Sequence, residues 1–323
     1  MAVQTTTAAG LDAYVADLRA AGLDAPWTRP GPLIPPKASA AQSRLWRWAD
    51  IERLVRRSPE FMKPGRGAER RIIRLDNPGV PERTATHTIS VAVQYLLPGE
   101  VAPAHRHTPN AVRFMLEGEG AFTTVAGDKC VMRRGDLVVT RTMSWHDHGN
   151  EGAAPVMWID GLDSPVVRYL ENLHMDAYPG EQQPVRDGAP ARDVHYLWAD
   201  AHTALQRKAD GDASPFDDVI VEYRQASGRP VVPALGCYLQ MLRPGVRTQA
   251  HRETSSAVYH VVRGRGSTVI DGVTLEWGQG DFLAIAPRAV HAHVNPGSEA
   301  AILFSFQDVP LLQALGLYRM EPA

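Results

Sequence analysis

The chain has 323 residues, with 34 Lys and Arg against 36 Asp and Glu and a net charge of −2 at pH 7. Such a balance gives no broad positive field, which excludes nucleic acid as the main partner. Hydrophobic residues make up 44%, yet no apolar run approaches the roughly 18 residues of a membrane span, so we expect a folded protein without membrane segments.

The N-terminal segment, residues 1–68, is predicted to be a helical arm. Leu11, Val15 and Leu18 recur at helical spacing, and a proline-rich connector covers residues 30–36. A second helix is expected over residues 43–57, with Trp46 and Trp48 as packing anchors. The segment has no basic stretch followed by an apolar core, and the whole chain has two cysteines. These features predict a cytoplasmic protein without a disulfide framework.

From about residue 70 the hydrophobic period changes from helical spacing to two. Residues 87–97 alternate between apolar and polar, and further short runs separated by glycine-containing turns follow, as in β-sandwiches and barrels. We expect a first β-domain over residues 69–165, a less regular linker over 166–217, and a second β-domain over 218–323. The second domain is predicted to end in a short apolar helix.

The two β-rich parts repeat. Gly99, His105 and Gly118 recur at an offset of 146 residues as Gly245, His251 and Gly264. Gly135, His146 and Asn150 recur at an offset of 145 as Gly280, His291 and Asn295. Six matching positions at almost the same offset predict two copies of the same domain.

These landmarks resemble the two motifs of the cupin family. The first reads GEVAPAHRHTPNAVRFMLEG and the second GDLVVTRTMSWHDHGN. The resemblance implies an all-β bicupin of two small antiparallel, jelly-roll-like barrels over about residues 85–305. The glutamate that is the usual fourth cupin ligand would fall at Ala111.

A metal site is predicted in the first copy. His105 and His107 share one face of a strand because side chains alternate, and His146 from the second motif can complete three corners of a coordination sphere. Imidazole ligands suit Fe, Zn, Cu or Ni, and three protein ligands leave positions open for substrate. The competing interpretation treats them as surface or turn histidines.

The second copy keeps His251 and His291 but has Glu253 where the middle histidine would stand. A His-x-Glu pair with a distant histidine can still bind a metal. Alternatively, this barrel keeps the scaffold and has lost the site. The sequence leaves both interpretations open.

Strand parity places Arg113 inside the first barrel together with Ala111. A buried guanidinium needs a carboxylate partner, either from a substrate or from an internal acid such as Asp160 or Glu117. His148 shares the parity of His146 and can move a proton near neutral pH. The site therefore suits a small anionic ligand that chelates the metal, and an aromatic ortho-hydroxy acid with O2 fits it.

Residues 69–168 resemble gentisate 1,2-dioxygenases and their relatives that act on salicylate and 1-hydroxy-2-naphthoate. The resemblance implies an Fe(II) enzyme that inserts both atoms of O2 and opens the ring between the carboxyl- and hydroxyl-bearing carbons. It implies a homotetramer with the N-terminal arm in the contacts. It implies His105, His107 and His146 as iron ligands. It implies that Arg113 and one arginine of the Arg70–Arg71 pair bind the substrate carboxylate. It also implies that Gln94, His148 and Asp160 lie in the substrate pocket.

Two inward positions depart from the family pattern, since Ser90 stands where an aromatic is common and Ala92 where glycine is frequent. Together with Arg141, which replaces a proline, they predict a pocket for a 5-substituted salicylate such as 5-nitrosalicylate, with gentisate as the other candidate. Salicylate or 1-hydroxy-2-naphthoate is an alternative substrate. Alternatives of other classes are a non-oxidative metal cupin, either isomerase or decarboxylase, and a non-catalytic bicupin.

Overall fold

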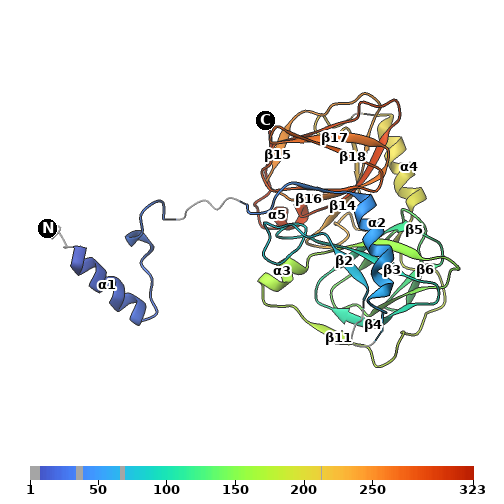
Figure 1. Cartoon of the computed structure of the whole chain (residues 1–323), viewed down its shortest axis with the longest axis horizontal. Coiled ribbons are helices and arrows are strands. Elements are labelled where there is room, and N and C mark those ends of the chain that lie inside the picture. The colour runs from blue at the N-terminus through green and yellow to red at the C-terminus, as the bar shows by residue number, and fades with distance from the viewer. Residues whose placement is uncertain (1–7, 34–38, 66–69, 212) are drawn as a thin grey trace. The chain divides into compact units, whose positions relative to one another are not determined.

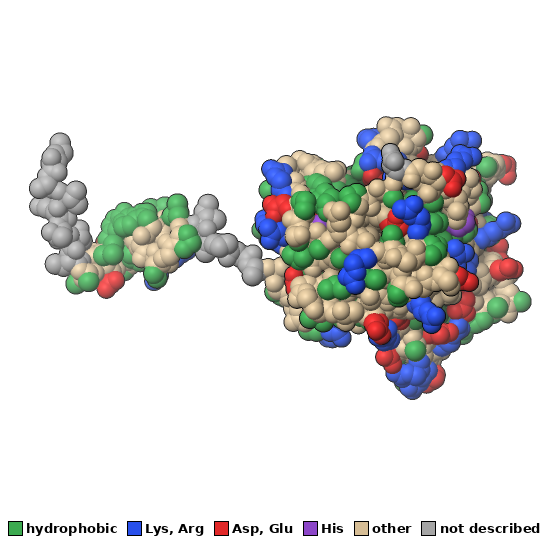
Figure 2. All heavy atoms as spheres, turned by 90° about the horizontal axis from the view of Figure 1, so that it is seen from above, with side chains coloured by type: hydrophobic (Ala, Val, Ile, Leu, Met, Phe, Trp, Pro, Cys, Tyr) green, Lys and Arg blue, Asp and Glu red, His purple; other side chains and the backbone are tan. Residues whose placement is uncertain are grey.

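The computed structural model describes residues 8–33, 39–65, 70–211 and 213–323, which form parts of two compact units, Met1–Ser39 and Ala40–Ala323. In the first unit, helix α1 (Ala8–Ala20) confirms the predicted helix, and a short 3₁₀ helix η1 (Pro26–Thr28) follows. None of the residues of α1 is buried, and hydrophobic side chains are exposed along this unit (Figure 2). The predicted arm boundary at residues 68 and 69 and part of the proline-rich connector lie outside the described residues.

The second unit contains two β-barrels, each built from two antiparallel sheets, which confirms the predicted bicupin (Figure 1). The first barrel combines a six-stranded sheet, β12-β8-β5-β10-β3-β2, with a five-stranded sheet, β11-β4-β9-β6-β7. Its strands are β2 (Ile72–Arg74), β3 (Ser90–Leu96), β4 (Val101–His107), β5 (Ala111–Glu117), β6 (Ala121–Val125), β7 (Asp128–Val131), β8 (Leu137–Thr140), β9 (His146–Asn150), β10 (Val156–Leu162), β11 (Met175–Ala177) and β12 (His195–Tyr196).

The second barrel repeats this plan with the sheets β1-β19-β16-β21-β14-β13 and β18-β17-β20-β15-β22. Its strands are β1 (Arg44–Trp46), β13 (Val219–Glu222), β14 (Gly236–Leu242), β15 (His251–Glu253), β16 (Ala257–Arg263), β17 (Arg265–Ile270), β18 (Val273–Gly278), β19 (Phe282–Ile285), β20 (His291–Val294), β21 (Ala301–Gln307) and β22 (Met320–Pro322). The predicted C-terminal helix is confirmed as α5 (Val309–Ala314).

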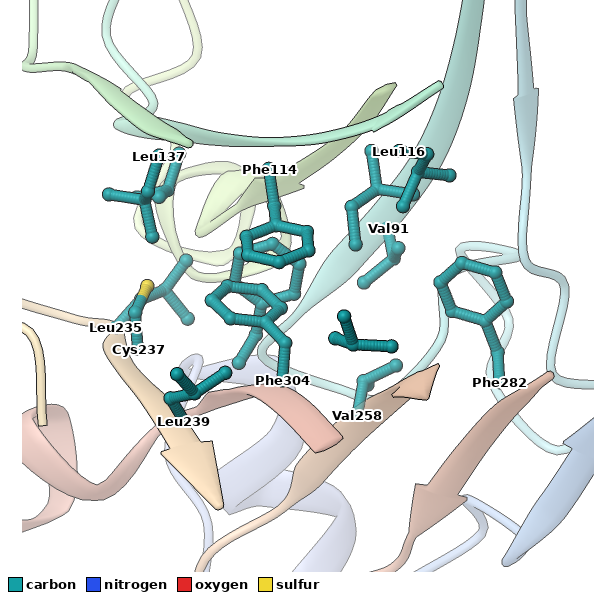
Figure 3. Close-up of a cluster of buried hydrophobic side chains, with 14 of the residues drawn as sticks. Val91, Phe114, Leu116, Leu137, Leu235, Cys237, Leu239, Val258, Phe282 and Phe304 are labelled. Atoms are coloured by element: carbon teal, nitrogen blue, oxygen red, sulfur yellow. The ribbon is translucent and has the colours of Figure 1, made fainter. Parts of the chain in front are cut away.

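The six-stranded sheets face each other across a shared hydrophobic core (Figure 3). Phe114 of the first barrel stacks on Phe304 of the second, with ring centroids 4.1 Å apart. On β3, Val91 and Val93 belong to this core. Because side chains alternate along a strand, the residues between them face the interior of the first barrel. That interior face carries the candidate site.

Each barrel is completed by a segment that precedes the other barrel in the chain. Strand β1, which comes before the first barrel, pairs with β19 of the second, and β12, which comes before the second barrel, pairs with β8 of the first. Helices α2 (Trp48–Arg57) and α4 (Trp198–Ala209) follow these two strands. The short helices η2 (Ser58–Glu60) and α3 (Ser164–Tyr169) complete the described helices.

The two helices dock in the same way. The backbone N–H of Trp48 donates to Asp281 at 2.8 Å, and that of Trp198 donates to Asp136 at 2.9 Å. Each indole lies against a glycine in the left-handed region, Gly280 and Gly135 respectively, where a Cβ would come within about 2.5 Å of the ring. The aspartates and glycines are equivalent positions of the repeat, so the two contacts are themselves repeated.

Two predictions are corrected, because segments of the chain contribute strands to the barrel that lies farther away in the sequence. The helix expected from residue 43 begins only at Trp48, because Arg44–Trp46 instead supplies an edge strand to β19. The segment 166–217, expected to be a less regular linker, contains β11, β12 and the twelve-residue helix α4. Cys130 and Cys237 are both buried and unpaired. No helix in the described ranges is long and apolar enough to cross a membrane.

Candidate metal centre

Two neighbouring strands of the first barrel bring together His105, His107 and His146, which we call the histidine trio. Strand β4 carries His105 and His107, and β9 places His146 directly opposite His105. The ring centroids of His105 and His146 are 4.0 Å apart, and that of His107 lies 5.3 and 4.8 Å from them. One donor nitrogen from each ring lies within 4.8 Å of the others. The structure therefore assembles the three predicted ligands.

Backbone carbonyls orient all three rings. The Nδ1 atoms of the trio lie 3.1, 2.7 and 2.9 Å from the carbonyl oxygens of Pro103, Pro109 and Ser144 respectively. For His107 and His146, a proton on Nδ1 leaves the Nε2 lone pair free, as metal-binding histidines require. Nδ1 of His105 lies between the Pro103 carbonyl and the Arg70 guanidinium. The Nε2 atoms of His105 and His146 are buried and have no hydrogen-bond partner in the described residues. Such atoms are costly unless a ligand satisfies them, so the trio fits a metal ion.

The surroundings keep the trio in its neutral, metal-binding form. Burial, reinforced by the nearby Arg70 guanidinium, lowers the pKa of His105 to about 2. Burial also lowers the pKa of His107 to about 4 and that of His146 well below its usual range. Neutral imidazoles do not have to lose a proton before they bind a cation at neutral pH.

The position of the usual cupin glutamate is Ala111, which is fully buried on β5. Its neighbours across the sheet are Thr140 on β8 and Leu162 on β10. A methyl group cannot coordinate a cation, so the protein supplies three ligands at this centre and leaves the remaining positions to other molecules.

Arg113 and Asp160 lie in register on β5 and β10 and form a buried ion pair, with Nε 3.0 Å from Oδ1. Arg113 also donates from Nη1 to Thr140 Oγ1 at 2.6 Å, and Trp158 Nε1 donates to Asp160 Oδ2 at 3.2 Å. Burial raises the pKa of the Asp160 carboxyl, and the positive charge of Arg113 opposes this rise. Of the two predicted partners for Arg113, the structure therefore shows the internal acid.

Two further buried polar side chains lie on the interior face of this barrel. Gln94, opposite Trp158, is fully buried, and neither atom of its amide has a hydrogen-bond partner in the described residues. His148 is also fully buried, with Nδ1 2.8 Å from Thr123 Oγ1 and Nε2 unpartnered. Burial, helped by the charge of Arg113, lowers the pKa of His148 well below its usual range. Both groups have hydrogen-bonding capacity left for a ligand.

The two adjacent arginines point in opposite directions. Arg70 contacts Nδ1 of His105 through its guanidinium. The buried guanidinium of Arg71 instead binds Glu100, donates to the carbonyl of Met62 and lies over the ring of Tyr95. Of the two arginines predicted as candidates for the carboxylate, Arg71 is thus engaged by Glu100 and Arg70 lies against the trio.

The small inward residues lie beside the ion pair. Ala92 is opposite Asp160, Ser90 is opposite Leu162, and both are buried. Arg141, expected beside the pocket, donates to the carbonyl of Asp193 at 3.0 Å. Arg141 is thus engaged with the backbone of Asp193, and Ser90 and Ala92 are the two small residues that face Leu162 and Asp160.

Sequence reasoning missed the partner of His148. Thr123 on β6 lies opposite His148 on β9 and holds its Nδ1. The second barrel repeats this contact between Thr268 and His293, at 2.9 Å. Both threonines and both histidines stand at the repeat offset, so extending the comparison of the two copies beyond glycines and histidines would have found the pair.

In the second barrel, His251 and His291 are again in register, with ring centroids 4.2 Å apart. Glu253 takes the position of His107. Across the described ranges, the histidine trio is the one group of three or more His, Cys, Asp or Glu residues whose donor atoms all lie within 4.8 Å of one another. The fold and the trio thus define a bicupin metalloprotein with a three-histidine centre in its first barrel.

Comparison with known proteins identifies the family. The family described as Cupin domain matches residues 92–162 and 238–306. The chain is 37% identical to 5-aminosalicylate 1,2-dioxygenase of Comamonas sp over 86% of this chain and 80% of that protein. It is 34% identical to gentisate 1,2-dioxygenase of Streptomyces sp over 96% and 94%. Salicylate 1,2-dioxygenase from Pseudoaminobacter salicylatoxidans, solved as adducts with gentisate, superposes with a TM-score of 0.88 at 30% identity, covering 99% and 96%.

The chain belongs to the gentisate and salicylate 1,2-dioxygenase family of bicupins. Members of this family are oxidoreductases that take an aromatic substrate and O2. The sequence resemblance to this family is therefore confirmed, and the histidine trio is the part of the chain that can hold its metal.

Proposed function

We propose that this protein is an Fe(II)-dependent ring-cleaving dioxygenase. It opens an aromatic ortho-hydroxy acid between the carbons that carry the carboxyl and hydroxyl groups. The observation that carries the proposal is the histidine trio, whose rings are fixed by backbone carbonyls and whose Nε2 atoms face one another. Ala111 adds no fourth ligand, so a chelating substrate and O2 have room beside the ion.

The trio suits ferrous iron by its chemistry. Imidazoles bind Fe(II), and a centre with three protein ligands keeps positions available for other molecules. Bound iron would supply the redox chemistry that lets O2 react with the ring. What the protein itself supplies is orientation, because side chains around the trio would hold the substrate ring beside the ion.

The substrate carboxylate is assigned to Arg70 and Arg113. Arg113 is already paired with Asp160, so its charge is largely neutralised inside the protein. Arg70 contacts the His105 ring through its guanidinium, which places a second positive charge beside the histidine trio. We infer that the two guanidinium groups together bind the carboxylate through charge-assisted hydrogen bonds.

Gln94 and His148 are assigned to the reacting end of the substrate. The unpartnered amide of Gln94 can donate to or accept from a ring hydroxyl. His148 is neutral, is held by Thr123 at Nδ1, and presents Nε2 within the barrel. A neutral imidazole in this position can hydrogen-bond a substrate hydroxyl through Nε2 and so orient the ring.

The ring substituent is assigned to the space beside Ser90 and Ala92. Both side chains are small, and both face the interior next to Asp160 and Leu162. This favours a 5-substituted salicylate, and the relative acting on 5-aminosalicylate supports the choice over gentisate alone. We also propose a cytoplasmic homotetramer with the N-terminal arm in its contacts, supported by the exposed Tyr14 and Trp27 on the arm.

A substrate panel tests the proposal. The protein is loaded anaerobically with Fe(II), and O2 uptake is measured with gentisate, salicylate, 5-aminosalicylate, 5-nitrosalicylate and 1-hydroxy-2-naphthoate. The proposal predicts the highest kcat/KM for 5-aminosalicylate or 5-nitrosalicylate. Exclusive turnover of gentisate, whose 5-substituent is a hydroxyl, would contradict the substituent assignment. Loss of CO2 or isomerisation without O2 uptake would contradict the dioxygenase. Light scattering of the full-length protein tests the tetramer.

A further inference from the structure

The second barrel retains half of the metal-binding geometry of the first. His251 and His291 face each other across β15 and β20, with ring centroids 4.2 Å apart, against 4.0 Å for His105 and His146. Their Nδ1 atoms lie 3.4 and 3.0 Å from the carbonyl oxygens of Gln249 and Ala289. As in the first barrel, this leaves the Nε2 atoms of two buried rings turned inward.

These rings line a small cavity of about 10 Å³. Its other walls are polar as well as apolar, and include Asp217, Glu253, Ser255, Tyr259 and Gln307. A cavity of this size accommodates about one water molecule or one ion. It cannot accommodate an aromatic acid, so any ligand here is of atomic size.

A carboxylate stands where the third ligand would be. Oε1 of Glu253 lies 3.9 Å from Nε2 of His251. The three donors are not as close together as those of the histidine trio, so the Glu253 side chain would have to move toward His291 when an ion binds. Ser255 Oγ donates to Oε2 at 2.5 Å and Tyr318 to Oε1 at 3.1 Å. Hydrogen bonds of this kind orient carboxylate ligands in metal sites.

The charges also differ from those of the first barrel. The position of His107 becomes Glu253, the position of Arg113 becomes Tyr259, and Asp217 is a second carboxylate on the same small cavity. Burial raises the pKa of Asp217, and the nearby histidines oppose the rise. Two carboxylates in so confined a space repel each other unless a cation or protons lie between them.

We propose that His251, His291 and Glu253, with Asp217 beside them, bind a divalent transition-metal ion as a second, closed site. Two imidazoles and two carboxylates neutralise such an ion without an additional anion, whereas the neutral trio of the first barrel leaves its ion positive and attractive to an anionic substrate. The cavity is too small for a substrate, and no arginine lines it. We therefore assign the site a structural role. The inference does not depend on the proposed function.

The site would also fasten the C-terminal end of the chain. Strand β22 pairs with β15, which carries His251 and Glu253, and Tyr318 binds the Glu253 carboxylate. An ion on Glu253 therefore ties the terminal strand to the barrel interior. Metal binding at this site is expected to raise the melting temperature, since a ligand that binds only the folded state stabilises it.

Metal counting tests the proposal. The full-length protein is stripped with a chelator, dialysed against Co²⁺ or Zn²⁺ and analysed for metal per chain. Two equivalents are expected for the wild type, one for His105→Ala and one for Glu253→Gln, whose side chain keeps its shape. Glu276→Gln, an exposed glutamate of the same barrel, is the matched control and should keep two. Circular dichroism verifies that each variant is folded.

A melting experiment separates the two sites. In the His105→Ala background, added Zn²⁺ should raise the melting temperature, and in His105→Ala/Glu253→Gln it should not. One equivalent in the wild type, or two retained in Glu253→Gln, would overturn the second site. Neither readout uses catalytic activity, so the second site can fail while the proposed dioxygenase stands, and the reverse.

Discussion

Arg113 and Asp160 face each other across β5 and β10 and form an ion pair inside the first barrel, with only 3% and 6% of their surfaces exposed. The pair lies on the interior face that also carries Ala92, opposite Asp160 on β3. An internal carboxylate thus offsets the cost of burying the Arg113 guanidinium inside this barrel.

Removing the carboxylate should be costly. Asp160→Asn leaves Arg113 charged and unpaired in a buried position, so we expect the free energy of unfolding to fall by about 3 kcal/mol or more. Urea unfolding measures it. Asp76→Asn is the matched control, because Asp76 pairs with the exposed Arg83, and it should cost less than about 1 kcal/mol. Equal losses in the free energy of unfolding would show that the buried pair stabilises the fold no more than the exposed pair does.

Arg70→Gln tests the carboxylate assignment more cleanly than Arg113→Ala, which also leaves Asp160 unpaired. Loss of a charge-assisted contact of about 2 kcal/mol should weaken salicylate binding roughly 30-fold. Anaerobic calorimetry of the metal-loaded protein gives the dissociation constant. Arg83→Gln, at an exposed position, should bind like the wild type. If Arg70→Gln binds with wild-type affinity, the assignment to Arg70 is wrong.

Ser90→Phe should narrow the pocket. The larger ring would fill interior space beside Leu162, so kcat/KM for 5-substituted salicylates should fall at least about 10-fold relative to that for salicylate. Steady-state O2 uptake with both substrates measures the ratio. Val131→Phe, on the exposed side of β7, should leave the ratio unchanged. An unchanged ratio in Ser90→Phe would place the substituent elsewhere.

His260, outside the metal centre, should make the protein sensitive to acid. Burial between Phe114 and Phe282 lowers its pKa to about 3. The unfolded chain binds a proton below about pH 6.5 and the folded chain does not, so stability falls as the pH drops from 6.5 toward 3. His260→Phe should reduce the stability lost between pH 6 and pH 4 by about 2 kcal/mol. Urea titrations of the metal-free proteins measure this, and parallel pH profiles would exclude the effect.

The sequence predicted the fold and the histidine trio because both depend on local periodicity. Alternation along a strand places His105 and His107 on one face, and the duplicated motifs identify the partner strand of His146. What the sequence could not supply is register. The family resemblance named Arg70 and Arg71 only as a pair, and which of the two lies near the trio depends on how the chain enters β2. The pairing of Arg113 with Asp160 depends on how β5 and β10 align.

The exchange of segments between barrels also escaped prediction. Leu45 falls on the helical stripe of Trp48, Ile51 and Val55, yet residues 44–46 form β1 because β19 offers an edge more than 230 residues away. Local propensity contains no information about such a partner. One signal was present, since Trp-Ala-Asp occurs at both Trp48 and Trp198, and these positions begin the two equivalent helices.

Isotope labelling with ¹⁸O2 tests most directly whether the histidine trio holds iron for ring cleavage. The Fe(II)-loaded protein is incubated under ¹⁸O2 with its best substrate, and the product is analysed by mass spectrometry. We predict a ring-opened product that carries both ¹⁸O atoms, absent from His105→Ala and present in His202→Ala, a histidine of helix α4 outside the trio. An unlabelled product, or equal labelled product from His105→Ala, would contradict the account.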